Sequence, residues 1–153
     1  MLGRLLVGAA VVWPLVAGGA LWQRAASPSE MPTLAALVYA AAGRVCHQRP
    51  ERSFHTHDVA WPVCARCAGL YLAAPFAAVL AFRRRSSIAS RFQPMRLVIL
   101  AAIPTMITLL WEWGGLGTPS NVWRFVTALP LGAAIAFVLI ATVTERRPSR
   151  SIG

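Results

Sequence analysis

Four apolar runs divide this chain, and each is long enough to cross a lipid bilayer as a helix. They cover residues 5–22, 63–82, 97–113 and 122–143. A spanning helix needs about 20 mainly apolar residues, because the hydrocarbon core of a bilayer is about 30 Å thick. Within that core the backbone must satisfy its own hydrogen bonds, which such segments achieve by forming helices. We therefore expect an all-α membrane protein, a single integral domain over residues 1–153 with about four transmembrane helices.

A fifth apolar stretch, residues 31–45, is too short to cross unaided, with about 14 apolar or small residues. We expect a short helix there that lies in the interface or re-enters the membrane partway. Residues 46–62 are polar and are interpreted as a loop. The first run has the length of a signal peptide, but Trp13 and Pro14 in its middle favour a retained anchor.

The arginines predict an orientation for these helices. Residues 83–96 hold five arginines and no acidic residue, and the positive-inside rule places such a segment in the cytoplasm. The arginines of the tail, residues 146–150, lie one hairpin away and therefore on the same side. We expect a multi-pass protein of the inner (plasma) membrane, with a cytoplasmic C-terminus and the 46–62 loop at the extracytoplasmic face.

The net charge of +10 also bears on the partners of the chain. Most arginines lie at the ends of apolar runs, where they meet anionic head groups, so we expect no nucleic-acid binding. The expected partner is the lipid bilayer. Since four short spans enclose little interior, a second copy of the chain or another membrane protein is a further candidate partner.

The side chains suited to soft metals or to thiol chemistry lie around the 46–62 loop. All three cysteines fall within 22 residues, and the three histidines fall among them: Cys46, Cys64, Cys67, His47, His55 and His57. Three thiolates and one imidazole form a tetrahedral set typical of structural zinc. We predict a metal site of Cys46, Cys64, Cys67 and His47, with zinc as the metal and iron or copper as alternatives. His55 or His57 could replace His47 as the imidazole, although both are better explained as solvated loop residues.

The pair Cys64 and Cys67 also supports an alternative function. Their spacing at the start of a predicted helix places both sulfurs on one face. The helix N-terminus and the neighbouring Arg66 both favour the thiolate. The chain could then be a membrane thiol–disulfide or electron-transfer protein in which Cys64 and Cys67 cycle and Cys46 resolves mixed disulfides. In a third alternative, a structural accessory membrane subunit, the cysteines only hold the loop.

Charged residues near the cysteines are candidates for ion pairs or for contacts with an anionic head group or phosphate. They are Arg49, Glu51, Arg52 and Arg66. Glu112 lies near the outer end of the 97–113 run, where it could pair with Arg124 or join the metal site. Because acidic residues within spans are functional candidates, Glu112 and Arg124 are the candidate catalytic residues if the protein is an enzyme. No known catalytic motif supports that function.

Two segments of the chain resemble a known signature. Residues 46–54 read Cys-His-Gln-Arg-Pro-Glu-Arg-Ser-Phe, and residues 62–71 read Pro-Val-Cys-Ala-Arg-Cys-Ala-Gly-Leu-Tyr. They are similar to the signature of a family of small prokaryotic predicted membrane proteins, domain of unknown function 2085. The resemblance implies an integral membrane protein and supplies no substrate, cofactor or reaction. The family pattern has an Asp where this chain has Thr108, and commonly a Gln where it has Glu112, so the carboxylate has moved one helical turn on the same face.

Overall fold

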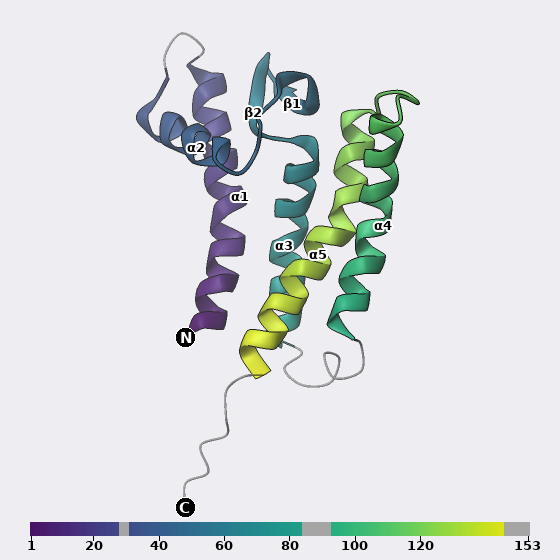
Figure 1. The fold of residues 1–153 in the computed structure, drawn as a ribbon. Coiled ribbons are helices and arrows are strands. Elements are labelled where there is room, and N and C mark those ends of the chain that lie inside the picture. The colour runs from purple at the N-terminus through teal and green to yellow at the C-terminus, as the bar shows by residue number, and fades with distance from the viewer. Residues whose placement is uncertain (28–30, 84–92, 146–153) are drawn as a thin grey trace, which may run out of the picture.

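Four long helices run side by side in the computed structural model, which describes residues 1–27, 31–83 and 93–145 (Figure 1). They are α1 (Leu2–Ala26), α3 (Ala65–Arg83), α4 (Pro94–Trp113) and α5 (Asn121–Glu145). Each is long and apolar enough to cross a membrane. The predicted fold class, an all-α protein with four candidate spans and one shorter apolar helix, is confirmed.

The shorter helix is α2 (Thr33–Gly43), which packs beside α1 near the end of that helix (Figure 1). It follows Pro32, whose missing N–H suits the start of a helix. It has 11 residues and so is about 17 Å long, well below the thickness of a bilayer core. The structure thus places a helix within the predicted range 31–45, with narrower bounds.

The segment predicted as a loop, residues 46–62, contains regular structure instead. A short 3-10 helix, η1 (Pro50–Arg52), leads into an antiparallel hairpin of β1 (Ser53–Thr56) and β2 (Val59–Cys64). The turn is closed by His57 and Asp58, whose φ angles of 49° and 64° are both positive. Two consecutive positive φ angles match the right-handed twist of the flanking strands, which is why such turns close hairpins.

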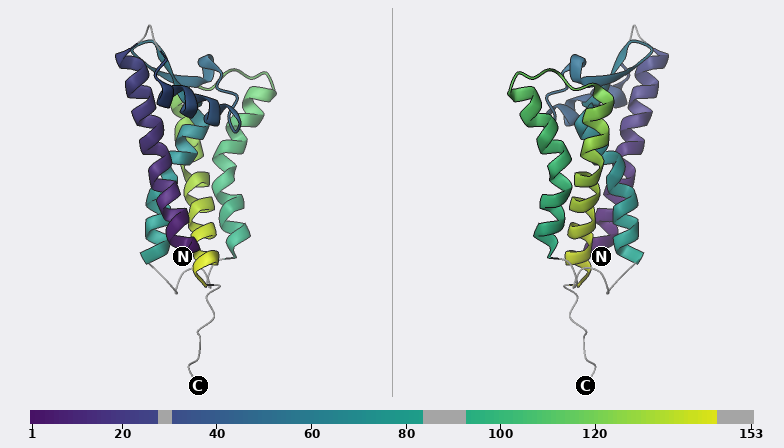
Figure 2. Two further views of the ribbon diagram at one scale, coloured as in Figure 1. Left: turned by 90° about the vertical axis from the view of Figure 1, so that its left-hand side faces the viewer. Right: turned by 90° about the vertical axis from the view of Figure 1, so that its right-hand side faces the viewer.

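The packing of α3 against α5 forms the centre of the bundle, where glycines bring the two backbones into contact. A methyl group at Gly69 would overlap the Phe125 carbonyl oxygen, and one at Gly132 would overlap the Leu70 carbonyl oxygen. Small residues allow this close approach, which is a common way for membrane helices to associate. Figure 2 shows α1 and α4 on the outer sides, with α1 packed on α3 and α4 chiefly on α5.

The hairpin and α2 lie together at one end of the bundle (Figures 1 and 2). The α4–α5 turn lies at that same end, whereas α1 begins and α5 finishes at the opposite end. Three hydrogen bonds tie the hairpin to α2. The Tyr39 hydroxyl donates to the Ala60 carbonyl at 2.7 Å, and Gln48 Nε2 donates to the carbonyls of Tyr39 at 2.8 Å and Pro62 at 2.7 Å. The hairpin is therefore held on the bundle end, where it brings Cys46 and Cys64 to the start of α3.

Candidate functional site

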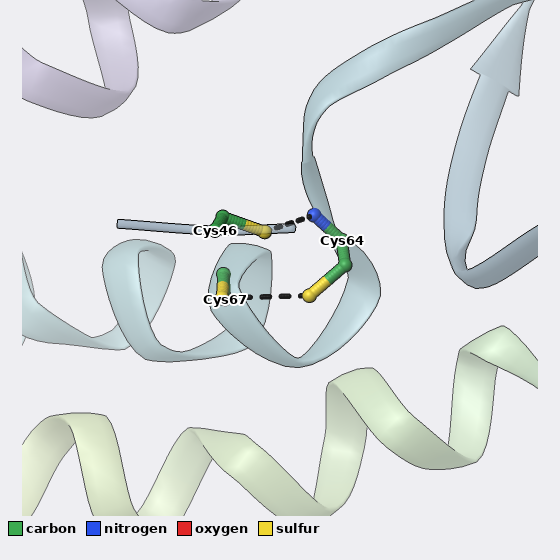
Figure 3. A group of neighbouring side chains, drawn as sticks. All are labelled: Cys46, Cys64 and Cys67. Carbon is green, nitrogen blue, oxygen red and sulfur yellow. Dashed lines mark hydrogen bonds between the residues drawn. The ribbon is translucent and has the colours of Figure 1, made fainter. Parts of the chain in front are cut away.

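The three cysteines converge from three parts of the chain (Figure 3). Cys46 follows α2, Cys64 is the last residue of β2, and Cys67 lies in the first turn of α3. Their Sγ atoms all lie within 4.8 Å of one another, and those of Cys64 and Cys67 are 3.4 Å apart. The Cys64 backbone N–H donates to Cys46 Sγ at 3.2 Å. This hydrogen bond holds the Cys46 sulfur next to those of Cys64 and Cys67.

This cysteine cluster has the spacing and the donors of a soft-metal site. A tetrahedral zinc ion with Zn–S bonds of about 2.3 Å places its sulfur ligands about 3.8 Å apart, within the range set by the three thiols. Buried Cys46 packs with the apolar residues Ala42, Val63 and Ala68. All three thiols are free, so each is available as a ligand.

The histidines are placed differently from the cysteines. His47 is exposed and lines a neighbouring cavity, and its imidazole is not among the clustered ligand atoms. His55 and His57 are exposed on the hairpin. Among the described residues the structure therefore brings together the three predicted sulfur ligands without a histidine.

The surroundings of Cys64 favour its thiolate. The pKa of Cys64 is lowered to about 5, chiefly by the Cys67 thiol beside it. Burial opposes this shift, and the backbone N–H groups of Cys67 and Arg66 and the Cys46 thiol support it. Unpaired N–H groups at the start of a helix stabilise a thiolate in this way. The sequence predicted that the charge of Arg66 would act here, but its guanidinium turns toward α4 instead.

That guanidinium joins a second cluster, in which Glu112 of α4 binds three arginines. Glu112 Oε1 lies 3.0 Å from Arg124 and 2.9 Å from Arg52, and Oε2 lies 3.2 Å from Arg66. The side chains of Glu112 and Arg124 are only 7% and 6% exposed. The predicted pair of Glu112 with Arg124 is present, and Arg52 and Arg66 extend it into a cluster linking η1, α3, α4 and α5. These four residues are called the arginine–glutamate cluster below.

Further hydrogen bonds hold this cluster against the hairpin. Arg124 donates to Asn121 Oδ1 at 2.9 Å, and Asn121 Nδ2 donates to the carbonyl of buried Ser53 at 2.9 Å. Arg66 also reaches Thr108 Oγ1 at 3.5 Å. In contrast, Arg49 and Glu51 form a 3.9 Å pair with both side chains more than half exposed, so Glu51 stays outside the cluster.

Both clusters face one cavity of about 380 Å³ at the hairpin end of the bundle. Its wall is formed by Cys46, Cys64, Cys67, His47, Arg49, Arg52, Arg66 and Arg124, together with Val45 and Trp113. The sequence predicted the cysteines as metal ligands and the charged residues near them as candidates for ion pairs or anion contacts. The structure places cysteines and arginines in the lining of the same cavity.

Comparisons with known proteins cover this same region. Residues 46–138 match a family described as Predicted membrane protein (DUF2085). An uncharacterized protein of Methanothermobacter thermautotrophicus is 36% identical over 92 residues, which cover 60% of this chain and 81% of the relative. An uncharacterized protein of Methanocaldococcus jannaschii is 27% identical over 108 residues, 71% of this chain and 69% of the relative. No solved structure matches. The matched region includes both clusters and leaves α1 outside.

Proposed function

Since the chain belongs to the family of predicted membrane proteins DUF2085, we propose that it carries a zinc-like metal centre at one end of a multi-pass membrane bundle. Cys46, Cys64 and Cys67 supply three thiolates, which bind zinc or alternatively iron or copper. The observation that carries the proposal is the convergence of the three sulfurs to within 4.8 Å. The fourth position is filled from the cavity side, by His47 after a side-chain movement or by an external ligand.

The proposed orientation puts the hairpin end at the extracytoplasmic face of the inner membrane. Large exposed aromatic side chains support a membrane boundary at this end: Trp22, Trp111, Trp113 and Trp123. Tryptophans gather at bilayer interfaces because their rings are apolar and their N–H groups are polar. The described arginines of the opposite end are Arg4, Arg83 and Arg96, which fit a cytoplasmic face. The arginines predicted to fix the orientation within 84–92 and 146–150 lie outside the described residues.

Elemental analysis of the purified, detergent-solubilised protein tests the metal centre. We expect about one metal equivalent per chain, because the three sulfurs form a single tetrahedral site. Cys46→Ser, Cys64→Ser and Cys67→Ser should each lose most of it, because a serine hydroxyl is a poor ligand for a soft metal. Full metal content in all three serine variants would refute the proposal.

Two histidine variants complete this experiment. His55→Ala is the matched control, since His55 is exposed on the hairpin outside the cysteine cluster, and it should keep the full metal content. His47→Ala identifies the fourth ligand. Lost metal in this variant assigns the position to His47, whereas retained metal assigns it to a ligand from the cavity.

The thiol–disulfide function is the second candidate, favoured by the 3.4 Å separation of Cys64 and Cys67 and by the lowered pKa of Cys64. A thiolate near neutral pH is the attacking species in disulfide exchange. Trapping of free thiols in growing cells tests it. A fraction of the protein with Cys64 and Cys67 oxidised, changing with the redox conditions, supports this function. Permanently reduced thiols with no metal leave the structural accessory subunit as the remaining proposal.

A second copy of the chain or another membrane protein remains a predicted partner, and we place it along α4. That helix has many exposed apolar side chains, which include Ile99, Leu100, Ile103, Ile107 and Leu110. The bilayer itself covers such a face in a single copy of the chain. A second copy of the chain would show as a dimer mass in native mass spectrometry of the detergent complex.

A further inference from the structure

The arginine–glutamate cluster beside the cysteines carries more positive charge than its own residues neutralise. Arg52, Arg66 and Arg124 share the single carboxylate of Glu112, which leaves two positive charges in excess among these four side chains. Buried charges are costly unless they are paired. Arg49 lines the same cavity and forms a long ion pair, 3.9 Å, with the exposed Glu51, so it adds further positive charge to the lining.

The hydrogen bonds lead to the same conclusion as the charges. A carboxylate offers about four lone-pair sites. Arg124 and Arg52 occupy Glu112 Oε1, and two nitrogens of Arg66 occupy Oε2. Glu112 therefore has no site left for further donors. Arg66 Nε and Arg124 Nε are buried and donate to no described residue. The cluster thus has donors left over as well as charge.

The cavity has the volume, the lining and the position that an anion-binding site needs. It measures about 380 Å³, and the three arginines and the three thiols all line it. Trp113 lines it and is 75% exposed, at the end where the other exposed tryptophans gather. A site at this level can be reached from the aqueous phase and from lipid head groups.

We propose that this cavity binds a phosphate group, held by Arg52, Arg66 and Arg124 beside the cysteine cluster. The planar guanidinium fork matches phosphate oxygens in pairs, and a doubly charged phosphate group balances the excess charge, which a single carboxylate does not. The same chemistry is offered by free phosphate and by the phosphomonoester head group of phosphatidic acid. The site rests on the arginines and not on the metal, so the two proposals can fail separately.

Calorimetric titration of inorganic phosphate into the protein in dodecyl maltoside tests the free-phosphate source. We expect saturable binding that chloride does not displace. Arg52→Gln should weaken it about tenfold or more, because hydrogen bonds between charged groups contribute strongly to affinity. Arg52 is the chosen position because its side chain is 37% exposed, so the buried pairs of Arg66 and Arg124 with Glu112 remain. Arg44→Gln is the matched control, since Arg44 is exposed at the same end and does not line the cavity.

Nanodiscs test the lipid source. The protein is placed in phosphatidylcholine with or without phosphatidic acid, and retained lipid is measured by native mass spectrometry. Phosphatidic acid kept by the wild type and Arg44→Gln, but lost from Arg52→Gln, assigns the site to a head group. Should Arg52→Gln not fold, Arg66→Lys keeps the charge, removes the planar fork and should show the same loss.

Two results overturn the proposal. One is the absence of both saturable phosphate binding and selective retention of phosphatidic acid. The other is equal binding by the wild type and the folded arginine variants. Metal content measured on the same samples keeps the two sites apart, because Arg52→Gln should retain the metal while Cys64→Ser should lose the metal and retain phosphate binding.

Discussion

Glu112 carries the one negative charge that three arginines share, and its side chain is 7% exposed. The substitution Glu112→Gln keeps its shape and removes the charge, which leaves Arg66 and Arg124 buried without a counter-charge. Breaking a buried ion pair from one side costs about 3–5 kcal/mol. We expect a loss of that size in the free energy of unfolding, measured by denaturant or thermal unfolding in detergent.

The matched control is Glu51→Gln, which removes the same charge from a 64% exposed side chain at 3.9 Å from its partner. Exposed pairs contribute about 0–1 kcal/mol, so this variant should unfold nearly as the wild type does. Equal destabilisation by the two substitutions would contradict the role of Glu112.

A second substitution should restore part of the lost stability. Thr108 lies one turn before Glu112 on the same face, and its Oγ1 is 3.5 Å from Arg66. A carboxylate at this position can therefore bind the same guanidinium. We expect Thr108→Asp combined with Glu112→Gln to unfold at a higher temperature than Glu112→Gln alone. No recovery would show that the position of the carboxylate, and not only its charge, is required.

Cys64 should react as a thiolate at mildly acidic pH in the metal-free protein. Its pKa is lowered to about 5, first by the neighbouring Cys67 thiol. The thiolate is present above that pKa and is lost as the pH falls through it, so iodoacetamide alkylation should be fast at pH 6 to 7 and slow below about pH 5. Cys67→Ala removes the neighbouring thiol and should move the midpoint to higher pH. Mass spectrometry of the alkylated protein gives both profiles, and identical midpoints would contradict this cause.

The grouping of the three cysteines could be predicted from the sequence, whereas most of the arginine–glutamate cluster could not. Cys64 and Cys67 are a local pair whose spacing fixes their common face. The pair of Arg66 with Glu112 joins residues 46 positions apart, and nothing in local spacing determines such a contact. His47 follows Cys46 directly, but Cys46 is buried and His47 exposed, so adjacency in sequence did not bring its side chain into the cluster.

At the scale of helices, the α3–α5 contact depends on glycine. Gly69→Ala places a methyl group against the Phe125 carbonyl oxygen and 3.1 Å from Ala128 Cβ. Overpacking of this kind costs about 1–3 kcal/mol, and we expect a corresponding loss of thermal stability in detergent. Gly8→Ala is the control, since a methyl group at Gly8 meets no atom within 4 Å. Similar losses for both variants would show that helix packing is not the cause.

The hairpin is the element that the sequence interpretation missed. Pro62 lies inside β2, and proline disfavours a strand because it lacks the N–H that a ladder requires. A sheet of two strands tolerates it, since each strand has one unpaired edge. The turn residues His57 and Asp58 lack the glycine that marks most tight hairpin turns, so the two positive φ angles had no clear signal in the sequence.

For the whole molecule, the proposed orientation predicts opposite results for reporters at two sites. A green fluorescent protein fused after the C-terminus should fluoresce, because it folds in the cytoplasm. Alkaline phosphatase inserted in the turn at 114–120, between α4 and α5, should be active, because that turn lies at the hairpin end. Exchanging the reporters is the control and should abolish both signals. The reverse pattern of reporter activity would show that the hairpin end faces the cytoplasm.

The number of long helices followed from the sequence because each apolar run has the length of a bilayer crossing. Their lateral order did not. The packing of α3 on α5, with α1 and α4 outside them, depends on where glycines such as Gly69 and Gly132 allow backbones to meet. Hydropathy alone does not indicate which of several apolar helices pack against each other.

The arginine–glutamate cluster also has a consequence for biosynthesis. A ribosome makes Arg52 and Arg66 before Glu112, and Glu112 before Arg124. The cysteine cluster can thus assemble once α3 has begun, but the two early arginines have no counter-charge until α4 is made. During that interval α3 carries the Arg66 charge near its N-terminal end without Glu112 to balance it, which opposes stable insertion of the helix in lipid. We therefore expect α3 to take its final position only after α4 has supplied the Glu112 carboxylate.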